Sequence, residues 1–207
     1  MSVFSRFFVD PQQTAELLSM QHSHALVLVS MLVAVLTSCM ALQIAGMARL
    51  SRSPASRQLA IATGALALGG GVWAMHFIGM LAMSLPVKVS YDPLLTGLSM
   101  LPSLAASWVA LGLLARRQIS RWQLVSGGVL VGAGIGLMHY SGMAAIQMQP
   151  LLRYDPWLFA LSIVVAVLLA IIALWVRSGL RGRMASLAAI AAGGTVMGLA
   201  ISGMHYT

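Results

Sequence analysis

Residues 124–146 read LVSGGVLVGAGIGLMHYSGMAAI, and this stretch decides the fold. It is 23 residues long and contains no Asp, Glu, Lys or Arg, and a helix needs about 20 residues to cross the hydrocarbon core of a bilayer. A helix is favoured over a barrel strand because the apolar run is continuous, and because a helix satisfies its own backbone hydrogen bonds in lipid. His139 is the unusual residue, since an ionisable side chain at membrane depth is costly and normally functional.

Five further apolar runs of similar length occupy residues 25–47, 59–83, 94–115, 157–176 and 185–204. The whole chain of 207 residues is 59% hydrophobic and 8% charged, whereas soluble domains contain about 25% charged residues. The sequence therefore excludes an ordinary soluble domain and predicts an all-α membrane protein, a bundle of six transmembrane helices.

The net charge is +8, and most of the basic residues behind it are arginines in the segments that connect the apolar runs. Nine of the 12 basic residues lie in three alternate loops, as Arg49, Arg52 and Arg57, then Arg116, Arg117 and Arg121, then Arg177, Arg181 and Arg183. By the positive-inside rule these loops are cytoplasmic, which predicts that both the N-terminus and the C-terminus lie outside. We expect no nucleic-acid partner.

Residues 1–21 contain charged residues and no long apolar core, so they are not predicted to be a cleavable signal peptide. We expect a short outer or interfacial segment there, followed by a membrane domain over residues 22–207. Cys39 is the only cysteine, which excludes a disulfide framework or a thiolate cluster within one chain.

A histidine motif ends three of the six runs, as Met75-His76-Phe77, Met138-His139-Tyr140 and Met204-His205-Tyr206. The first two copies are 63 residues apart and the last two 66, and Tyr91-Asp92-Pro93 returns 63 residues later as Tyr154-Asp155-Pro156. The chain is therefore predicted to contain three two-helix repeats. His22-Ser23-His24 stands where the first repeat would carry its tyrosine, which places all five histidines near the outer face.

Small residues precede each histidine. Gly69, Gly132 and Gly198 each lie seven residues before the histidine of their run, which is about two helical turns, so glycine and histidine share a face. Small residues let membrane helices approach closely, so the histidine helices are predicted to converge. The same ladders suit packing inside the bundle and a homodimer interface equally well.

The donor atoms favour copper. His76 and Met80 are four residues apart and share a helix face, as are His139 and Met143. Imidazole suits several transition metals, thioether sulfur favours Cu(I), and no run contains the carboxylate that a harder ion would prefer. The predicted metal ligands are His76, His139, His205, His22, His24, Met80 and Met143, with Met75, Met138 and Met204 either ligating or only packing, because adjacent residues point about 100° apart on a helix. No catalytic residue is predicted; Asp92 and Asp155 are expected to cap helices.

These residues resemble the MHYT family of bacterial integral-membrane sensor domains, named for the residues that close this chain, Met204-His205-Tyr206-Thr207. The resemblance covers the chain from His22 onward. It implies a domain of the bacterial inner membrane that binds copper near its outer, periplasmic face and senses a diatomic gas such as oxygen, carbon monoxide or nitric oxide. It also implies that larger members carry cytoplasmic diguanylate cyclase or cyclic-di-GMP phosphodiesterase domains, and that this chain is itself no enzyme.

The sequence ends before the methionine that would match Met80 and Met143. We therefore expect a truncated chain, or a stand-alone form that signals through a partner protein. Two other functions stay open. Two histidines could be axial iron ligands in a haem protein or redox-active membrane enzyme, and a copper transporter would carry soft ligands along a path through the membrane.

Overall fold

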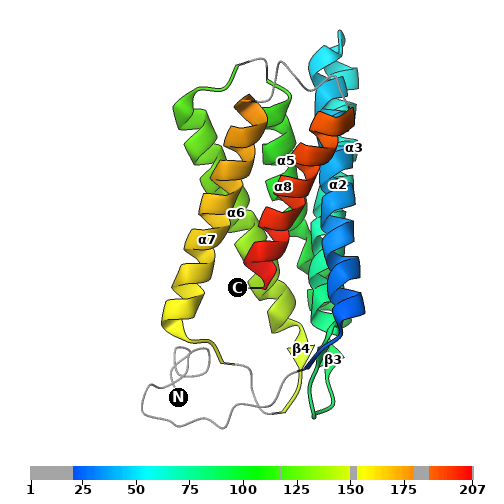
Figure 1. The fold of residues 1–207 in the computed structure, drawn as a ribbon, viewed down its shortest axis with the longest axis vertical. Helices are drawn as coiled ribbons and strands as arrows, with labels where there is room; N and C mark the ends of the chain where they lie inside the picture. The colour runs from blue at the N-terminus through cyan, green and yellow to red at the C-terminus, as the bar shows by residue number, and fades with distance from the viewer. Residues whose placement is uncertain (1–20, 117, 150–152, 180–186, 207) are drawn as a thin grey trace.

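The computed structural model describes residues 21–116, 118–149, 153–179 and 187–206, apart from the side chains of residues 177–179 and Met204. Three predicted features lie outside these described residues. They are the interfacial segment except for its last residue, the arginines at 117, 181 and 183, and the start of the sixth apolar run. The described part is an all-α bundle with short strand pairs at one end (Figure 1). The predicted fold class is confirmed at this level.

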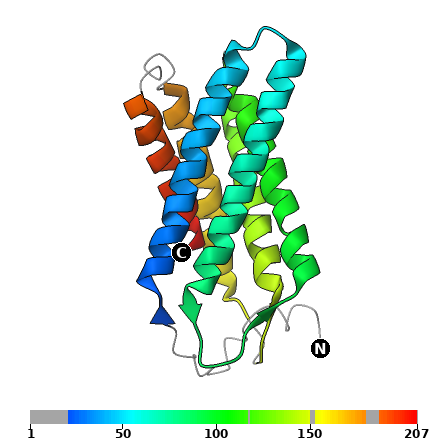
Figure 2. The ribbon, with the colours of Figure 1, turned by 90° about the vertical axis from the view of Figure 1, so that its right-hand side faces the viewer.

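The helices follow one another around a ring, as the two views show (Figures 1 and 2). They are α2 (His24–Leu50), α3 (Pro54–Leu81), α4 (Pro93–Leu98), α5 (Met100–Leu114), α6 (Arg121–Ala144), α7 (Pro156–Gly179) and α8 (Leu187–His205). Each of α2, α3, α5, α6, α7 and α8 packs against the next, and α8 packs against α2, which closes the ring.

Five spans in the described residues are long and apolar enough to cross a membrane, with α4 and α5 together forming one of them. The apolar part of α8, Leu187–Gly203, is shorter. A helix satisfies most of its backbone groups internally, which is the requirement that a bilayer imposes.

The third apolar run is divided into α4 and α5 at Ser99 rather than forming the single helix predicted over residues 94–115. Pro102 explains the division, because proline has no N–H to donate to the carbonyl of Leu98 and its ring clashes with that carbonyl. Asp92 caps α4, accepting a hydrogen bond from the backbone N–H of Leu95 at 2.9 Å, as predicted. Asp155 caps α7 in the same way, through the N–H groups of Trp157 and Leu158.

Two short antiparallel strand pairs, which were not predicted from the sequence, close the first and the second repeat at one end of the bundle. β1 (Gln21–His22) pairs with β2 (Met83–Ser84), and β3 (Ser90–Tyr91) pairs with β4 (Ile146–Gln147). In each pair the residues before a repeat's first helix meet the residues after its histidine helix. His22 opposes Met83 just as Tyr91 opposes Ile146. The geometry therefore follows the repeat seen in the sequence.

The predicted glycine ladder is used inside the bundle. A Cβ atom at Gly69 would lie 2.8 Å from the Cα atom of Leu104, and one at Gly198 would lie 2.6 Å from that of Val35. Gly132 makes the equivalent close approach to α7. Each histidine helix therefore packs backbone against backbone on the first helix of the next repeat, and only glycine fits at these contacts.

Candidate metal centre

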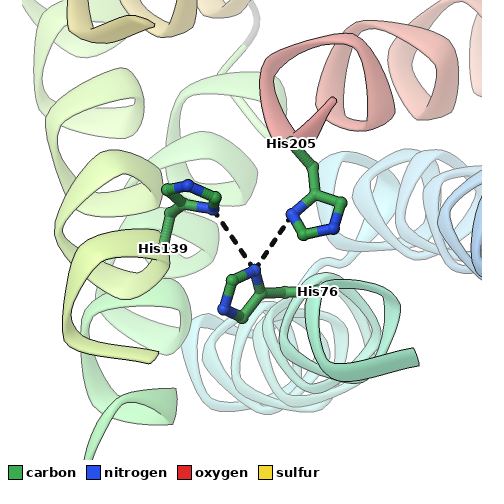
Figure 3. A group of neighbouring side chains, drawn as sticks. All are labelled: His76, His139 and His205. Carbon is green, nitrogen blue, oxygen red and sulfur yellow. Dashed lines mark hydrogen bonds between the residues drawn. The ribbon is translucent and has the colours of Figure 1, made fainter. Parts of the chain in front are cut away.

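Three histidines, one from each repeat, point toward a common centre (Figure 3). His76 comes from α3, His139 from α6 and His205 from α8. The Nδ1 atom of His76 lies 3.0 Å from Nδ1 of His205 and 3.3 Å from Nδ1 of His139. One ring nitrogen from each of the three lies within 4.8 Å of the others. Residues that are 129 positions apart in the chain thus form one cluster because the ring closes.

Hydrogen bonding alone cannot satisfy these nitrogens. In a neutral imidazole, Nδ1 is either one donor or one acceptor, so Nδ1 of His76 can share a proton with only one of the two Nδ1 atoms that it faces. The ring is fully buried, and its Nε2 atom has no hydrogen-bond partner. Each buried polar group left without a partner costs about 1–3 kcal/mol. A cation held by the three Nδ1 atoms would satisfy the crowded centre.

The spacing fits such an ion. A metal–imidazole bond of about 2.0–2.1 Å places ligand nitrogens roughly 3.3–3.6 Å apart in tetrahedral or trigonal geometry. Of the two observed separations from Nδ1 of His76, 3.3 Å lies within this range and 3.0 Å is a few tenths of an ångström below it. Within the described residues, no thiolate or carboxylate joins the cluster. The nitrogen donors of the cluster are therefore three imidazoles.

Two glycines make room for the rings. A Cβ atom at Gly142 would lie 2.8 Å from Cδ2 of His76, and one at Gly79 would lie 2.7 Å from Cδ2 of His205. In both cases Nε2 of the ring would be closer still. Each glycine lies three residues after its own repeat's histidine and receives the ring of another repeat's histidine. This role was not predicted from the sequence, although the glycine recurs at the same place in the first two motifs.

The motif tyrosines tie the histidine helices to their neighbours. The hydroxyl of Tyr140 lies 2.5 Å from that of Ser162 on α7, and the hydroxyl of Tyr206 lies 2.7 Å from that of Ser30 on α2. Phe77 has no hydroxyl, and there the indole N–H of Trp73 donates to the equivalent serine, Ser99, at 3.1 Å. All three repeats therefore make the same type of connection to the next helix.

The structure keeps the other two predicted histidine ligands away from these three. His22 and His24 are exposed and lie outside the cluster. Met75 and Met138 are fully buried in the hydrophobic core, as expected of packing residues. Met80 is buried and Met143 is half-buried, each one helical turn beyond its histidine, and the side chain of Met204 lies outside the described residues.

Comparison with known proteins gives consistent matches. The family model MHYT, described as a bacterial signalling protein N terminal repeat, matches residues 69–127 and 132–190. The bifunctional diguanylate cyclase/cyclic di-GMP phosphodiesterase MucR of Pseudomonas aeruginosa is 43% identical over 187 residues, which cover 90% of this chain and 27% of that protein. The cyclic di-GMP phosphodiesterase NbdA of the same organism is 36% identical over 193 residues, covering 90% of this chain and 24% of NbdA.

A third relative is the signaling protein YkoW of Bacillus subtilis, which is 37% identical over 149 residues, covering 70% of this chain and 18% of YkoW. The chain thus spans at most 27% of the length of these relatives. No solved structure gives a significant match. The two matched repeats begin 63 residues apart, which is the repeat distance of the first two histidine motifs.

Proposed function

The chain belongs to the MHYT family of bacterial signalling proteins, and we propose that it is a membrane-embedded sensory domain that binds a copper ion through His76, His139 and His205. The observation that carries this proposal is that Nδ1 of the buried His76 lies 3.0 Å from Nδ1 of His205 and 3.3 Å from Nδ1 of His139. We propose that a diatomic gas, or a change of redox state, acts at this ion and alters how the helices pack. Such a signal requires two helix arrangements with different ligand affinities.

Cu(I) is favoured over divalent ions by charge as well as by donor type. The idealised cost of burying an ion rises with the square of its charge, so a monovalent ion costs about one quarter as much as a divalent one. No carboxylate in the described residues offsets that charge at the cluster. Imidazole accepts Cu(I) readily, and the thioether of Met80 is a soft donor one turn away. Zinc would have to bury two charges among three neutral ligands.

The alternatives fit the cluster less well. Axial haem ligands approach iron from opposite faces of a porphyrin, whereas here three ring nitrogens crowd one point. A transporter needs donors beyond the cluster, but one turn deeper the histidine helices carry Val72, Ile135 and Ile201. A sensor needs only the single site.

The arrangement in the membrane and the output are part of the same proposal. We propose six spans in the bacterial inner membrane, with the N-terminus and the copper site near the periplasmic face. Among the described arginines, Arg49, Arg57, Arg116 and Arg121 lie at helix ends opposite the histidine cluster, and a cytoplasmic location suits them. Because two relatives are cyclic di-GMP enzymes, we propose that this domain controls cyclic-di-GMP output, through a joined cytoplasmic domain or a partner protein.

Elemental analysis of protein purified without chelator tests the proposal. We expect stoichiometric copper in the wild-type protein and strongly reduced copper when His76, His139 and His205 are changed together to alanine. Circular dichroism would verify that this variant remains helical, and the variant His22→Ala/His24→Ala is the matched control. Copper at the wild-type level in the triple variant, or an intense visible haem band in the wild-type protein, would overturn the proposal.

A further inference from the structure

A small apolar cavity of about 40 Å³ lies in the middle of the ring, and the three histidine helices form part of its wall. Val72, Ile135 and Ile201 line it, and each lies four residues before the histidine of its own helix. Residues four apart share a helix face and are separated by about one turn. The cavity therefore begins one helical turn from the histidine cluster, on the side that faces the middle of the bundle.

The chemistry of the wall excludes water. Of the residues that line the cavity, Ser107 alone carries a polar group. The volume is roughly three times the 10–15 Å³ that one water molecule occupies on this measure, but a water also needs two to four polar partners. Apolar cavities of this kind stay dry and accept apolar molecules instead. The size suits a molecule of two or three heavy atoms.

The cavity is closed unevenly. Its walls on α3 and α5 are sealed, since Val72, Ala106 and Ala110 are at most 4% exposed. On α7 and α8 the lining is mixed: Ala166, Ala170, Leu174 and Ile201 are at most 8% exposed, whereas Leu169, Ala173, Met197 and Ala200 are partly exposed. The least closed wall therefore lies between α7 and α8, which run side by side in the ring (Figure 1). In a membrane this wall faces hydrocarbon, in which apolar solutes are more stable than in water.

We infer that this cavity is a second binding site, which takes one small uncharged apolar molecule from the lipid through the α7–α8 wall. The identity of the natural ligand rests on the proposed function: it is a diatomic gas, held one helical turn from the copper ion. The rest of the inference does not depend on that function. The cavity would raise the gas concentration beside the ion and would make occupancy sensitive to the packing of α7 on α8. A helix shift in this region would thus change ligand affinity, which is what a two-state sensor requires.

Xenon tests the cavity directly, since it is apolar, monatomic and unreactive. The metal-free full chain is reconstituted in lipid nanodiscs, and methyl NMR signals are followed as xenon pressure rises. We expect saturable shifts for the methyl groups of Val131, Ile135 and Ile201, which line the cavity, and only linear, small shifts for lipid-facing methyl groups. Ala110→Leu fills the cavity and should abolish the saturable shifts, whereas Ala105→Leu, on the exposed face of the same helix, should preserve them.

Two outcomes would overturn the inference: a wild-type protein without saturable shifts, or an Ala110→Leu protein that responds as the wild type does. If Ala110→Leu does not fold, the milder Val131→Ile variant should still weaken xenon binding. Because the protein is metal-free, the result does not depend on copper. Xenon binding without any copper binding would contradict the proposed function and support the cavity site. Copper binding without xenon binding would support the proposed function and contradict the cavity site.

Discussion

Gly142→Ala should damage the metal centre without touching a ligand. The added Cβ atom would lie 2.8 Å from Cδ2 of His76, and an ordinary carbon–carbon contact needs about 3.5 Å, so the ring must retreat by about 0.7 Å or more. Metal–ligand distances tolerate only about 0.2 Å. The ring has little freedom, because His76 is fully buried and the new Cβ atom would also lie 3.4 Å from Cζ of Phe77. The Nδ1 atom of His76 should therefore leave the common centre.

We expect copper affinity to fall about 10- to 100-fold, which is typical when the groups that orient a ligand are changed. The effect on stability should be smaller, because overpacking costs about 1–3 kcal/mol while alanine favours a helix over glycine by about 0.5–1 kcal/mol. A titration against a colorimetric Cu(I) chelator measures the affinity, and thermal unfolding measures the stability.

Gly70→Ala is the matched control, because a Cβ atom at this position on α3 would meet nothing within 4 Å. It should leave copper affinity unchanged. The reasoning is refuted if Gly142→Ala and Gly70→Ala bind copper equally well while both remain folded.

Two further predictions concern the tyrosines. Ser162→Ala removes the partner of the Tyr140 hydroxyl and should lower the free energy of unfolding by about 1–3 kcal/mol. The control is Ser141→Ala, which should cost less because the Ser141 hydroxyl donates to carbonyls of its own helix. Equal shifts of the unfolding temperature in the two variants would contradict this prediction. Burial and the neighbouring Tyr140 raise the pKa of Tyr154 to about 12, against about 10 in an unfolded chain. Between these pH values the folded protein retains a proton that the unfolded chain releases, so the contribution of Tyr154 to stability should fall as pH rises. The difference in tyrosinate absorbance between wild type and Tyr154→Phe should accordingly appear near pH 12 rather than near pH 10.

The sequence predicted the helices well because a bilayer makes secondary structure a local problem. Each span must satisfy its own backbone and present apolar side chains, so its length and composition are visible in the residues themselves. The repeat was equally visible, and the strand pairs and glycine contacts follow it. The division at Ser99 was missed, although Pro102 carried the signal.

The ligand set was less predictable. The register of the repeats and the arginine topology placed five histidines near one face of the bundle, but neither can tell which of them face inward. His22 and His24 precede or begin a helix and remain exposed, whereas His76, His139 and His205 project from the inner faces of three helices. The sequence likewise identified glycines for helix packing and overlooked Gly79 and Gly142, because a ring from a distant repeat fills the space beside them.

From its sequence alone this protein is an all-α membrane bundle of repeated hairpins with a histidine near the end of each, because these features depend on interactions within a span or between neighbours in the chain. Tertiary structure alone decided which histidines meet, which glycines hold their rings and where the cavity lies. These features depend on α8 closing against α2, a contact between segments far apart in the sequence. Only when that ring closes do three similar local motifs become one site.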